Sequence, residues 1–289
     1  MGGLPPEPVR LACAAMGTRF ELVLEDRAGG GSLRGAGEAA LDEVLLWHGR
    51  LTAFEGSSVV SHIGRSGGEW CSIDAETAEL LELCRGMWEK TAGAFDPTVG
   101  PLMEAWGLRG GVVDLEAVAA ARACTGMNLV ELDGRRVRLT NPGVRLDLGG
   151  VGKGWAIDRA LEVLRGAGVT RALIHAGTSS IGAIGRWGVA VRFDEGDGRP
   201  MGLEDMCLSV SAPRGRVAAG VPHILDPRLG CPVPGRVTTA AVVHPSAAVA
   251  DAMSTALIVD PSLRGMLTAS LNAAIFLEPH DADTRAIPA

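Results

Sequence analysis

Several features are missing from this sequence of 289 residues, and each absence excludes a class of protein. No apolar stretch reaches the roughly 20 residues that a membrane-spanning helix needs. The sequence also lacks a dense run of Lys and Arg, and its formal net charge is −7. A protein that binds nucleic acid needs a basic face for the phosphates. We therefore expect neither an integral membrane segment nor a nucleic-acid partner.

A C-x-x-C pair and a signal peptide are absent as well. The six cysteines are scattered, which argues against a zinc site built on cysteine, and a chain of this length does not need disulfides. The first 20 residues, MGGLPPEPVRLACAAMGTRF, contain no charged region followed by an apolar one. We therefore expect free thiols and a cytoplasmic location, with export open if the chain was trimmed.

What is present is the composition of a globular protein, with 47% hydrophobic and 21% charged residues. The pattern predicts a hairpin over 128–140 with a type I′ turn at Asp133-Gly134, and helix N-caps at Asp74, Asp114 and Ser246. Helices and strands alternate irregularly, which favours an α+β fold with mostly antiparallel sheets over a doubly wound fold. Strands are further predicted over 19–25, 144–148, 171–177, 187–193, 206–211, 238–243 and 273–277, and helices over 34–51 and 155–168.

A glycine-rich turn, GGVGKG, occupies residues 149–154 between a predicted strand and a predicted helix. Closely spaced glycines allow backbone N–H groups to approach phosphate oxygens at the start of a helix. Gly154 stands where the Walker A motif needs Ser or Thr, and the dinucleotide-binding spacing is absent too. The residues alone leave a phosphate cradle and a plain tight turn equally open.

Two further polar residues, Asp96 and His223, lie in segments rich in proline and glycine. Asp96 belongs to GAFDPTVGPL (93–102), where an aspartate before proline can simply bond its own backbone. His223 opens HILDPRLGCPV (223–233), and a single histidine in a loop often does no more than satisfy a carbonyl. Taken alone, each residue fits a structural role at least as well as a functional one.

The segment ADAMSTA (250–256) carries a stronger signal, because one carboxylate and one hydroxyl stand four residues apart on an otherwise apolar helix. Asp251 and Thr255 share a helix face. Apolar residues cover the rest of the surface, so Asp251 is expected to be buried and to need a hydrogen bond, an ion pair or a cation. An all-oxygen pair suits Mg²⁺ better than zinc. The alternative is an ion pair between Asp251 and a buried arginine.

Taken together, these segments resemble the ApbE family, the FAD:protein FMN transferases. The resemblance runs from about Leu11 to Phe276. It implies an α+β, ApbE-like fold with one flavin transferase domain over 11–279 and flexible termini over 1–10 and 280–289. The matching segments, in order, are MGT (16–18), LTAFEGSSVVSHI (51–63), GAFDPTVGPL (93–102), LDLGGVGKGWAIDRA (146–160), HILDPRLGCPV (223–233) and ADAMSTAL (250–257).

The family resemblance also implies a cofactor site for FAD with Mg²⁺ at its pyrophosphate. The metal would be held by Asp251, Thr255 and the carbonyl of Gly152. His223 would stand near the transferred phosphoryl group, and His223 or Asp251 would act as the base. The residues implied to contact or line the FAD site are Met16, Phe54, Ala94, Phe95, Asp96, Asp147 and Lys153.

The implied reaction is a Mg²⁺-dependent transfer of FMN from FAD onto a Thr or Ser hydroxyl of an acceptor flavoprotein, with release of AMP. The chain departs from many relatives at HAGTSSIG (175–182) and VSAPRGR (210–216). It also lacks tyrosine, so Trp155 stands where a tyrosine is frequent and Phe54 is left for any flavin stacking. Two alternatives remain: a pyrophosphatase that yields FMN and AMP, and a non-catalytic flavin-binding paralogue. A nicotinamide-dependent reductase is disfavoured because the dinucleotide fingerprint is missing.

Overall fold

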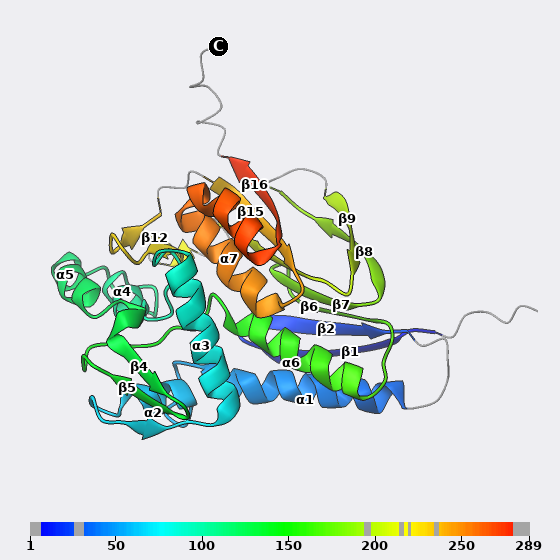
Figure 1. Cartoon of the computed structure of the whole chain (residues 1–289), viewed down its shortest axis with the longest axis horizontal. Coiled ribbons are helices and arrows are strands. Elements are labelled where there is room, and N and C mark those ends of the chain that lie inside the picture. The colour runs from blue at the N-terminus through cyan, green and yellow to red at the C-terminus, as the bar shows by residue number, and fades with distance from the viewer. Residues whose placement is uncertain are drawn as a thin grey trace, which may run out of the picture.

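A seven-stranded antiparallel sheet forms the centre of the computed structural model, which describes residues 7–25, 32–193, 198–213, 217–218, 221–233 and 237–279 (Figure 1). The expected α+β fold with antiparallel sheets is confirmed. The order along the sheet is β1 (Val9–Ala15), β2 (Thr18–Leu24), β6 (Ala172–Ala176), β7 (Ser180–Ile184), β10 (Cys207–Ser211), β15 (Val237–His244) and β16 (Ala274–Pro279).

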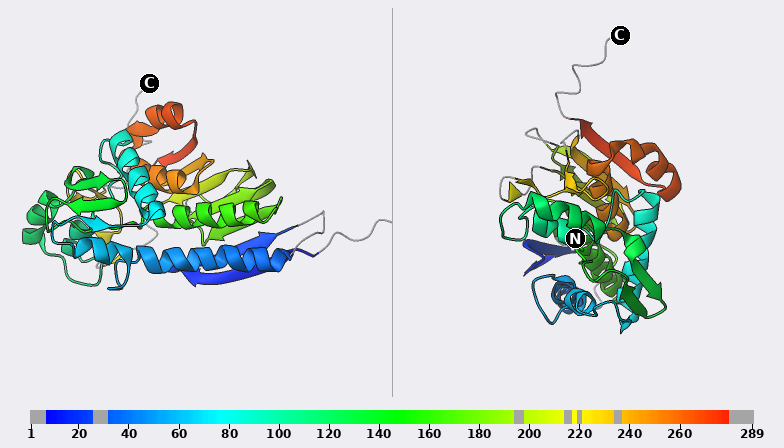
Figure 2. Two further views of the ribbon diagram at one scale, coloured as in Figure 1. Left: turned by 60° about the horizontal axis from the view of Figure 1, so that its bottom comes forward. Right: turned by 90° about the vertical axis from the view of Figure 1, so that its left-hand side faces the viewer.

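Three helices pack side by side on one face of this sheet, as Figures 1 and 2 show. They are α1 (Leu33–Leu51), α6 (Gly152–Gly166) and α7 (Ala247–Val259). The opposite face is covered by the hairpin of β8 (Arg186–Val191) and β9 (Arg199–Glu204), whose Val191 and Leu203 pack on Leu208 of the sheet. The middle of the sheet is therefore buried on both faces, which is why the first six residues of β15 are all buried, whereas β1 at the edge exposes alternate residues.

A second group of elements packs at one end of the sheet and its helices (Figure 2). It includes the small sheet of β3 (Cys71–Ser72), β5 (Arg136–Leu139) and β4 (Val130–Asp133), with α3 (Ala75–Lys90) beside α7. The remaining elements are α2 (Val59–Gly64), α4 (Gly100–Ala105), α5 (Leu115–Ala123), η1 (Met127–Leu129), β11 (Val217–Ala218), β12 (Val221–Pro222), β13 (Leu225–Asp226), β14 (Cys231–Pro232), η2 (Pro261–Leu263) and α8 (Arg264–Leu271).

Two contacts fix α6 against α7. Asp158 on α6 accepts hydrogen bonds from Ser246 Oγ at 2.7 Å and from the backbone N–H groups of Ala247 and Ala248 at 2.7 and 3.0 Å. It therefore caps the N-terminus of the neighbouring helix, where a carboxylate is favoured by the helix dipole. One turn earlier, a Cβ on Gly154 would lie 2.7 Å from Cα of Ala248 and closer still to the carbonyl of Ala247. Only glycine allows the two backbones to approach this closely.

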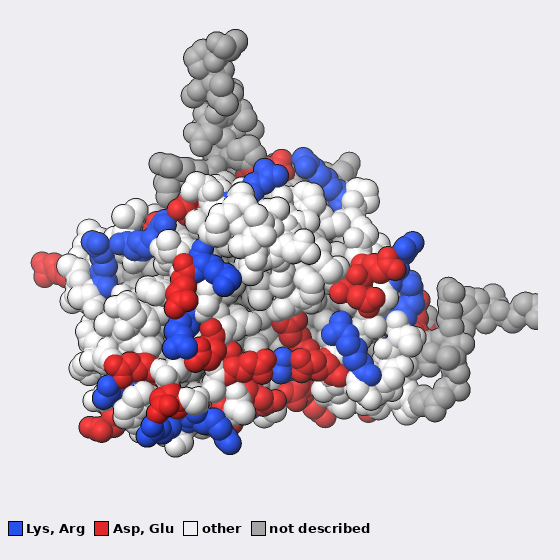
Figure 3. Space-filling model, in the orientation of Figure 1, with Lys and Arg blue, Asp and Glu red and all other residues white. Residues whose placement is uncertain are grey.

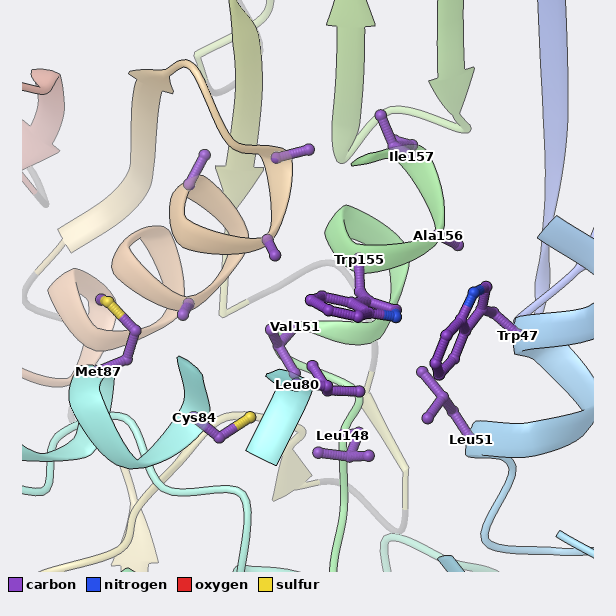
Figure 4. Packing of buried hydrophobic residues seen from close by; sticks show 14 of the residues in the cluster. Trp47, Leu51, Leu80, Cys84, Met87, Leu148, Val151, Trp155, Ala156 and Ile157 are labelled. Carbon is purple, nitrogen blue, oxygen red and sulfur yellow. The ribbon is translucent and has the colours of Figure 1, made fainter. Parts of the chain in front are cut away.

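Two indole rings, Trp47 of α1 and Trp155 of α6, are fully buried where these helices meet (Figure 4). Their ring centroids are 5.4 Å apart and their planes meet at 84°. The Nε1 donor of Trp155 has no N or O acceptor among the described residues, and Figure 4 shows this nitrogen pointing toward the ring of Trp47. An N–H···π contact of this kind is weak but satisfies a donor that would otherwise be unpaired.

Most elements lie where the sequence predicts them. The helices expected over 34–51, after Asp74 and after Asp114 correspond to α1, α3 and α5, and Ser246 caps α7 as expected. The first strand begins at Val9, inside the segment expected as a flexible terminus, whereas residues 1–6 and 280–289 lie outside the described residues. No helix in the described ranges is both long and apolar enough to cross a membrane.

Two local predictions were wrong. Residues 144–148 do not form a strand: Arg145 makes a single isolated bridge to Val99, and the alternating apolar residues are buried in the core without a ladder. The hairpin turn is centred on Gly134 and Arg135, since Asp133 pairs with Arg136. Only Gly134 has a positive φ, of 56°, so the turn is not type I′; a glycine at the first central position is what type II′ favours.

Charged side chains on the face shown in Figure 3 are predominantly acidic where α1, α3 and α6 meet. Arg159 of α6 pairs with two of them, with Glu79 of the neighbouring α3 at 3.7 Å and with Glu162 of its own helix at 2.7 Å. The excess of acidic residues in the sequence is thus partly gathered on this face.

Candidate functional site

Asp251 lies in the middle of α7 and is 3% exposed. Its Oδ2 accepts a hydrogen bond from the backbone N–H of Gly154 at 3.1 Å, and its Oδ1 accepts from Ser209 Oγ at 2.9 Å and Ser180 Oγ at 3.4 Å. Lys153 Nζ stands 3.6 Å from Oδ2. The expectation of a buried, hydrogen-bonded carboxylate is confirmed. The cationic side chain beside Asp251 is a lysine, whereas the alternative interpretation predicted an ion pair with a buried arginine.

Thr255 follows one turn later on the same helix, as the spacing predicts. Its Oγ1 donates to the carbonyl of Asp251 at 3.1 Å, which leaves lone pairs available on the hydroxyl oxygen. A Cβ on Gly150 would lie 3.3 Å from Thr255 Oγ1 and 3.5 Å from Phe95 Cε2. The Thr255 hydroxyl therefore faces the glycine-rich turn, with the Phe95 ring beside it.

The glycine-rich turn runs into α6, which begins at Gly152 rather than at Trp155 as predicted. Position 154 requires glycine because the backbone packs directly against α7. At Gly150 the absence of a side chain leaves space next to the Thr255 hydroxyl. Gly152 packs near Leu51 at the end of α1, since a Cβ there would be 3.4 Å from Leu51 Cδ1. The glycines thus bring three helices together at one helix N-terminus, where backbone donors favour an anion.

Asp147 connects this turn to the segment that contains Asp96. Its Oδ1 accepts from Gly149 N at 2.9 Å, and its own N–H donates to the carbonyl of Pro97 at 2.7 Å. Its Oδ2 accepts from Arg109 Nη2 at 2.9 Å. Arg109, whose side chain is 14% exposed, was missed by sequence reasoning because 38 residues separate it from Asp147 and no motif marks it.

Asp96 takes the structural role that its sequence context allowed. It is buried, and its Oδ1 accepts from Thr98 N at 2.8 Å and Thr98 Oγ1 at 2.5 Å. Burial raises the pKa of Asp96 to about 6, although the hydrogen bonds from Thr98 oppose the shift. Ala94 and Phe95 are buried as well. This segment therefore packs against the glycine-rich turn, with the Phe95 ring next to Gly150.

Met16 and Phe54, the residues expected at the flavin, differ in burial: Met16 is partly buried against the main core, whereas Phe54 is exposed. Met16 has a left-handed φ of 51° in the β1–β2 turn, and its N–H donates to His48 Nδ1 at 3.2 Å. Phe54 is 79% exposed and follows α1 by three residues, so its ring is free to meet a ligand. None of the described contacts joins Phe54 directly to Asp251.

His223 lies between β12 and β13 and is half-buried. The loop after it folds around Asp226, whose Oδ1 accepts a hydrogen bond from Arg228 N at 2.9 Å and whose Oδ2 accepts one from Arg228 Nη2 at 2.9 Å. Arg228 Nη1 also donates to Asp260 at the end of α7, at 3.0 Å. The structure therefore ties the His223 loop to the helix that carries Asp251 and Thr255.

A network of serine hydroxyls around Asp251 was not recognised in the sequence. Ser254 Oγ lies 3.2 Å from Ser209 Oγ and 2.8 Å from Ser211 Oγ. Ser180 belongs to the departing segment 175–182 and Ser211 to the departing segment 210–216, of which residues 214–216 lie outside the described residues. Serines on neighbouring strands thus converge on one buried carboxylate. This arrangement can be recognised only once the pairing of the strands is known.

The oxygen donors at this site fit a magnesium ion whose coordination is completed by phosphate oxygens of a ligand. In the described part of the chain no three His, Cys, Asp or Glu side chains are grouped so that they could hold a metal ion by themselves. Asp251 and the Thr255 hydroxyl offer oxygen donors that together carry one negative charge, and the family resemblance adds the carbonyl oxygen of Gly152. Mg²⁺ is commonly bound by one or two carboxylates together with substrate phosphates. The ammonium group of Lys153 beside Asp251 shows that this position already accommodates a cation.

A buried carboxylate, a hydroxyl one turn away and a lysine therefore meet at a glycine-rich helix start, and these are kinds of groups that bind hard cations and phosphates. The chain belongs to the ApbE family, whose model matches residues 16–276. The structure is similar to the crystal structure of the ApbE protein of Thermotoga maritima, with a TM-score of 0.84 and 29% identity over 96% of this chain and 99% of that one.

Two curated relatives are named FAD:protein FMN transferase. The protein of Rhodobacter capsulatus is 34% identical over 212 residues, which cover 66% of this chain but 40% of the relative. The protein of Vibrio cholerae is 26% identical over 290 residues, which cover 93% of this chain and 86% of the relative. The chain thus spans less than half of one relative and most of the other.

Proposed function

We propose that this protein is an enzyme that transfers FMN from FAD to a Thr or Ser hydroxyl of an acceptor flavoprotein, with Mg²⁺ and with release of AMP. Membership of the ApbE family and the names of the curated relatives support the transfer of FMN. The single observation in this chain that carries the proposal is the buried carboxylate of Asp251, held by Gly154 N–H and facing Lys153 at the glycine-rich turn. Such a carboxylate suits a cation-assisted reaction at a pyrophosphate.

Some residues of the proposed site would bind the metal ion and the pyrophosphate of FAD, and another would take up the proton of the acceptor hydroxyl. Asp251, Thr255 and the carbonyl of Gly152 would hold Mg²⁺, which, when bound, neutralises charge on the pyrophosphate. Phosphoryl transfer depends mostly on positioning and electrostatics, so the rigid α6–α7 pair contributes by fixing these groups. Lys153 adds a positive charge at the same end of α6.

The transfer exchanges the phosphoanhydride bond of FAD for a phosphate ester bond to the acceptor. The acceptor oxygen forms a bond to the FMN phosphorus, the bond from that phosphorus to the bridging oxygen breaks, and this oxygen leaves with AMP. The hydroxyl proton passes to a base. Both oxygens of Asp251 already accept hydrogen bonds, from Gly154, Ser180 and Ser209, which favours His223 as the base and Asp251 as the cation ligand.

The test combines purified protein, FAD, Mg²⁺ and a threonine-bearing flavinylation peptide, with the peptide mass and AMP as readouts. We expect an FMN-sized addition to the threonine and an equal amount of AMP. Asp251→Asn should abolish both while the protein stays folded, and Asp133→Asn, in the exposed β4–β5 hairpin, should change neither. AMP without labelled peptide would instead indicate hydrolysis of FAD, and bound FAD with neither product would indicate a non-catalytic flavin-binding protein.

A further inference from the structure

Lys153 makes two contacts that place its positive charge inside the site. Its Nζ lies 3.6 Å from Asp251 Oδ2 and donates to the carbonyl of Gly149 at 3.4 Å. The Lys153 side chain is 19% exposed and that of Asp251 is 4% exposed. The ammonium therefore lies at the mouth of the site, between the buried carboxylate and the glycine-rich turn.

This position is unfavourable for a cation unless an anion compensates it. Lys153 is the second residue of α6, and the positive end of a helix dipole repels cations. The first turn of α6 contains no acidic residue, and Val151 provides no side-chain cap. Asp251, which reaches across from α7, is the carboxylate that offsets both the ammonium charge of Lys153 and the positive end of the α6 dipole. Conversely, a buried carboxylate is costly without a countercharge, and Lys153 provides one.

We propose that Lys153 is the resident counterion of Asp251, and that a metal ion and a nucleotide pyrophosphate must displace it together. A divalent cation bound to Asp251 would stand close to the ammonium, and the two would repel each other. A pyrophosphate at the glycine-rich turn gives the ammonium a new anionic partner. The inference rests on the proposed function for the identity of these ligands, and it makes their binding cooperative.

Lysine has the properties that such an exchange needs. Its ammonium is a compact charge on a flexible four-carbon stem, so it can turn from Asp251 to a phosphate without movement of α6. An arginine would be held by a planar, bidentate geometry and would release the carboxylate less readily. The sequence contains 25 arginines and two lysines, and the second lysine, Lys90, is exposed at the end of α3. Lys90 therefore offers a matched control.

The test measures two affinities of the full chain without any turnover. Mn²⁺ binding is followed by electron paramagnetic resonance with no nucleotide present, and ADP binding is followed by calorimetry in the presence of EDTA. For Lys153→Met we expect Mn²⁺ to bind about tenfold more tightly than to the wild type, and ADP to bind about tenfold more weakly, in line with typical coupling between sites. Lys153→Arg should leave Mn²⁺ binding weak, and Lys90→Met should change neither affinity.

The opposite signs of these two changes distinguish the counterion role from general damage to the site, which would weaken both ligands. If Lys153→Met left the Mn²⁺ affinity unchanged or lowered it, the inference would be wrong even if the protein transfers FMN. If Mn²⁺ and ADP behaved as expected but no FMN were transferred, the counterion role would stand and the proposed function would fall.

Discussion

Arg228 donates a hydrogen bond of 3.0 Å to Asp260, and this contact joins the loop that follows His223 to the C-terminal end of α7. The same guanidinium is held by the buried carboxylate of Asp226, three residues after His223. Asp226 and Asp260 together raise the pKa of Arg228, so the link is permanently charged. The side chain of Arg228 thus connects the loop of His223 to α7, the helix that carries Asp251 and Thr255.

Breaking this link should impair transfer more than metal binding. Asp260→Asn can keep the hydrogen bonds to Ser262 through Oδ1 but weakens the charged contact with Arg228. We expect the turnover number to fall about tenfold, which corresponds to a loss of about 1.4 kcal/mol. The Mn²⁺ affinity should stay within about twofold of wild type, because Asp251 lies in the middle of the rigid helix. Equal losses in both measurements would show that Asp260 supports α7 as a whole.

Gly154→Ala should destabilise the protein strongly. The new methyl group would collide with the backbone of Ala247 and Ala248, and overpacking of this kind costs about 1–3 kcal/mol or more. Gly166, at the other end of the same helix, has open space where a Cβ would lie, so Gly166→Ala should be neutral or stabilise by up to about 1 kcal/mol. Urea unfolding of both variants checks the contrast. A Gly154→Ala protein as stable as wild type would mean that α6 and α7 can separate at little cost.

The serine network should affect metal affinity according to its distances to Asp251. Ser209 Oγ donates at 2.9 Å and Ser180 Oγ at 3.4 Å to the same carboxylate oxygen. Loss of an outer-shell hydrogen bond typically weakens a metal site by 10- to 100-fold, so we expect about a tenfold weaker Mn²⁺ affinity for Ser209→Ala. Ser180→Ala should have the smaller effect, within about twofold. The same order should appear by calorimetry with Mg²⁺, and a larger effect of Ser180→Ala would contradict the assigned geometry.

Asp96 should make the unfolding free energy depend on pH. Its pKa rises from 3.8 to about 6 on folding because the carboxyl is buried, so between these pH values the folded state holds a proton that the unfolded state has lost. This contribution to stability is fully present below about pH 4 and is lost as the pH rises through 6, with a size of roughly 3 kcal/mol. Asp96→Asn can keep both bonds from Thr98 through Oδ1 but does not titrate.

The measurement is the difference in unfolding free energy between wild type and Asp96→Asn at pH 7 and at pH 4.5. We expect the wild type to gain about 1–3 kcal/mol relative to the variant at the lower pH. An unchanged difference would show that Asp96 is not desolvated in the folded protein.

Local patterns predicted the parts of the fold that depend on local physics. Asp74, Asp114 and Ser246 cap the helices they precede because each side chain reaches an N–H two or three residues ahead, a relation visible in the sequence. Asp251 and Thr255 were found in the same way, from helical spacing on an apolar helix. The predicted strand over 144–148 failed because burial of alternating residues in a core produces the same pattern as a strand.

Relations across the fold were not accessible to this reasoning. Arg109 reaches Asp147 over 38 residues, and Arg228 reaches Asp260 over 32. Ser180 and Ser209 meet at Asp251 only because β7 pairs with β10, whose register places Ser180 opposite Ser209. For Gly154 the sequence left a phosphate cradle and a plain tight turn equally open, and neither interpretation included its close packing on α7. Each of these contacts depends on which elements pack together, and a single sequence does not encode that pairing locally.

The cap that Asp158 of α6 places on α7 has a consequence for the kinetics of ligand binding. Because this cap and the close approach at Gly154 lock the two helices into one rigid body, the entropy of arranging Asp251, Thr255 and the glycine-rich turn is already lost when the chain folds. A ligand therefore meets a preorganised receptor. Association should follow single-exponential kinetics whose rate rises linearly with ligand concentration, without the plateau that a slow closure of the helices would impose.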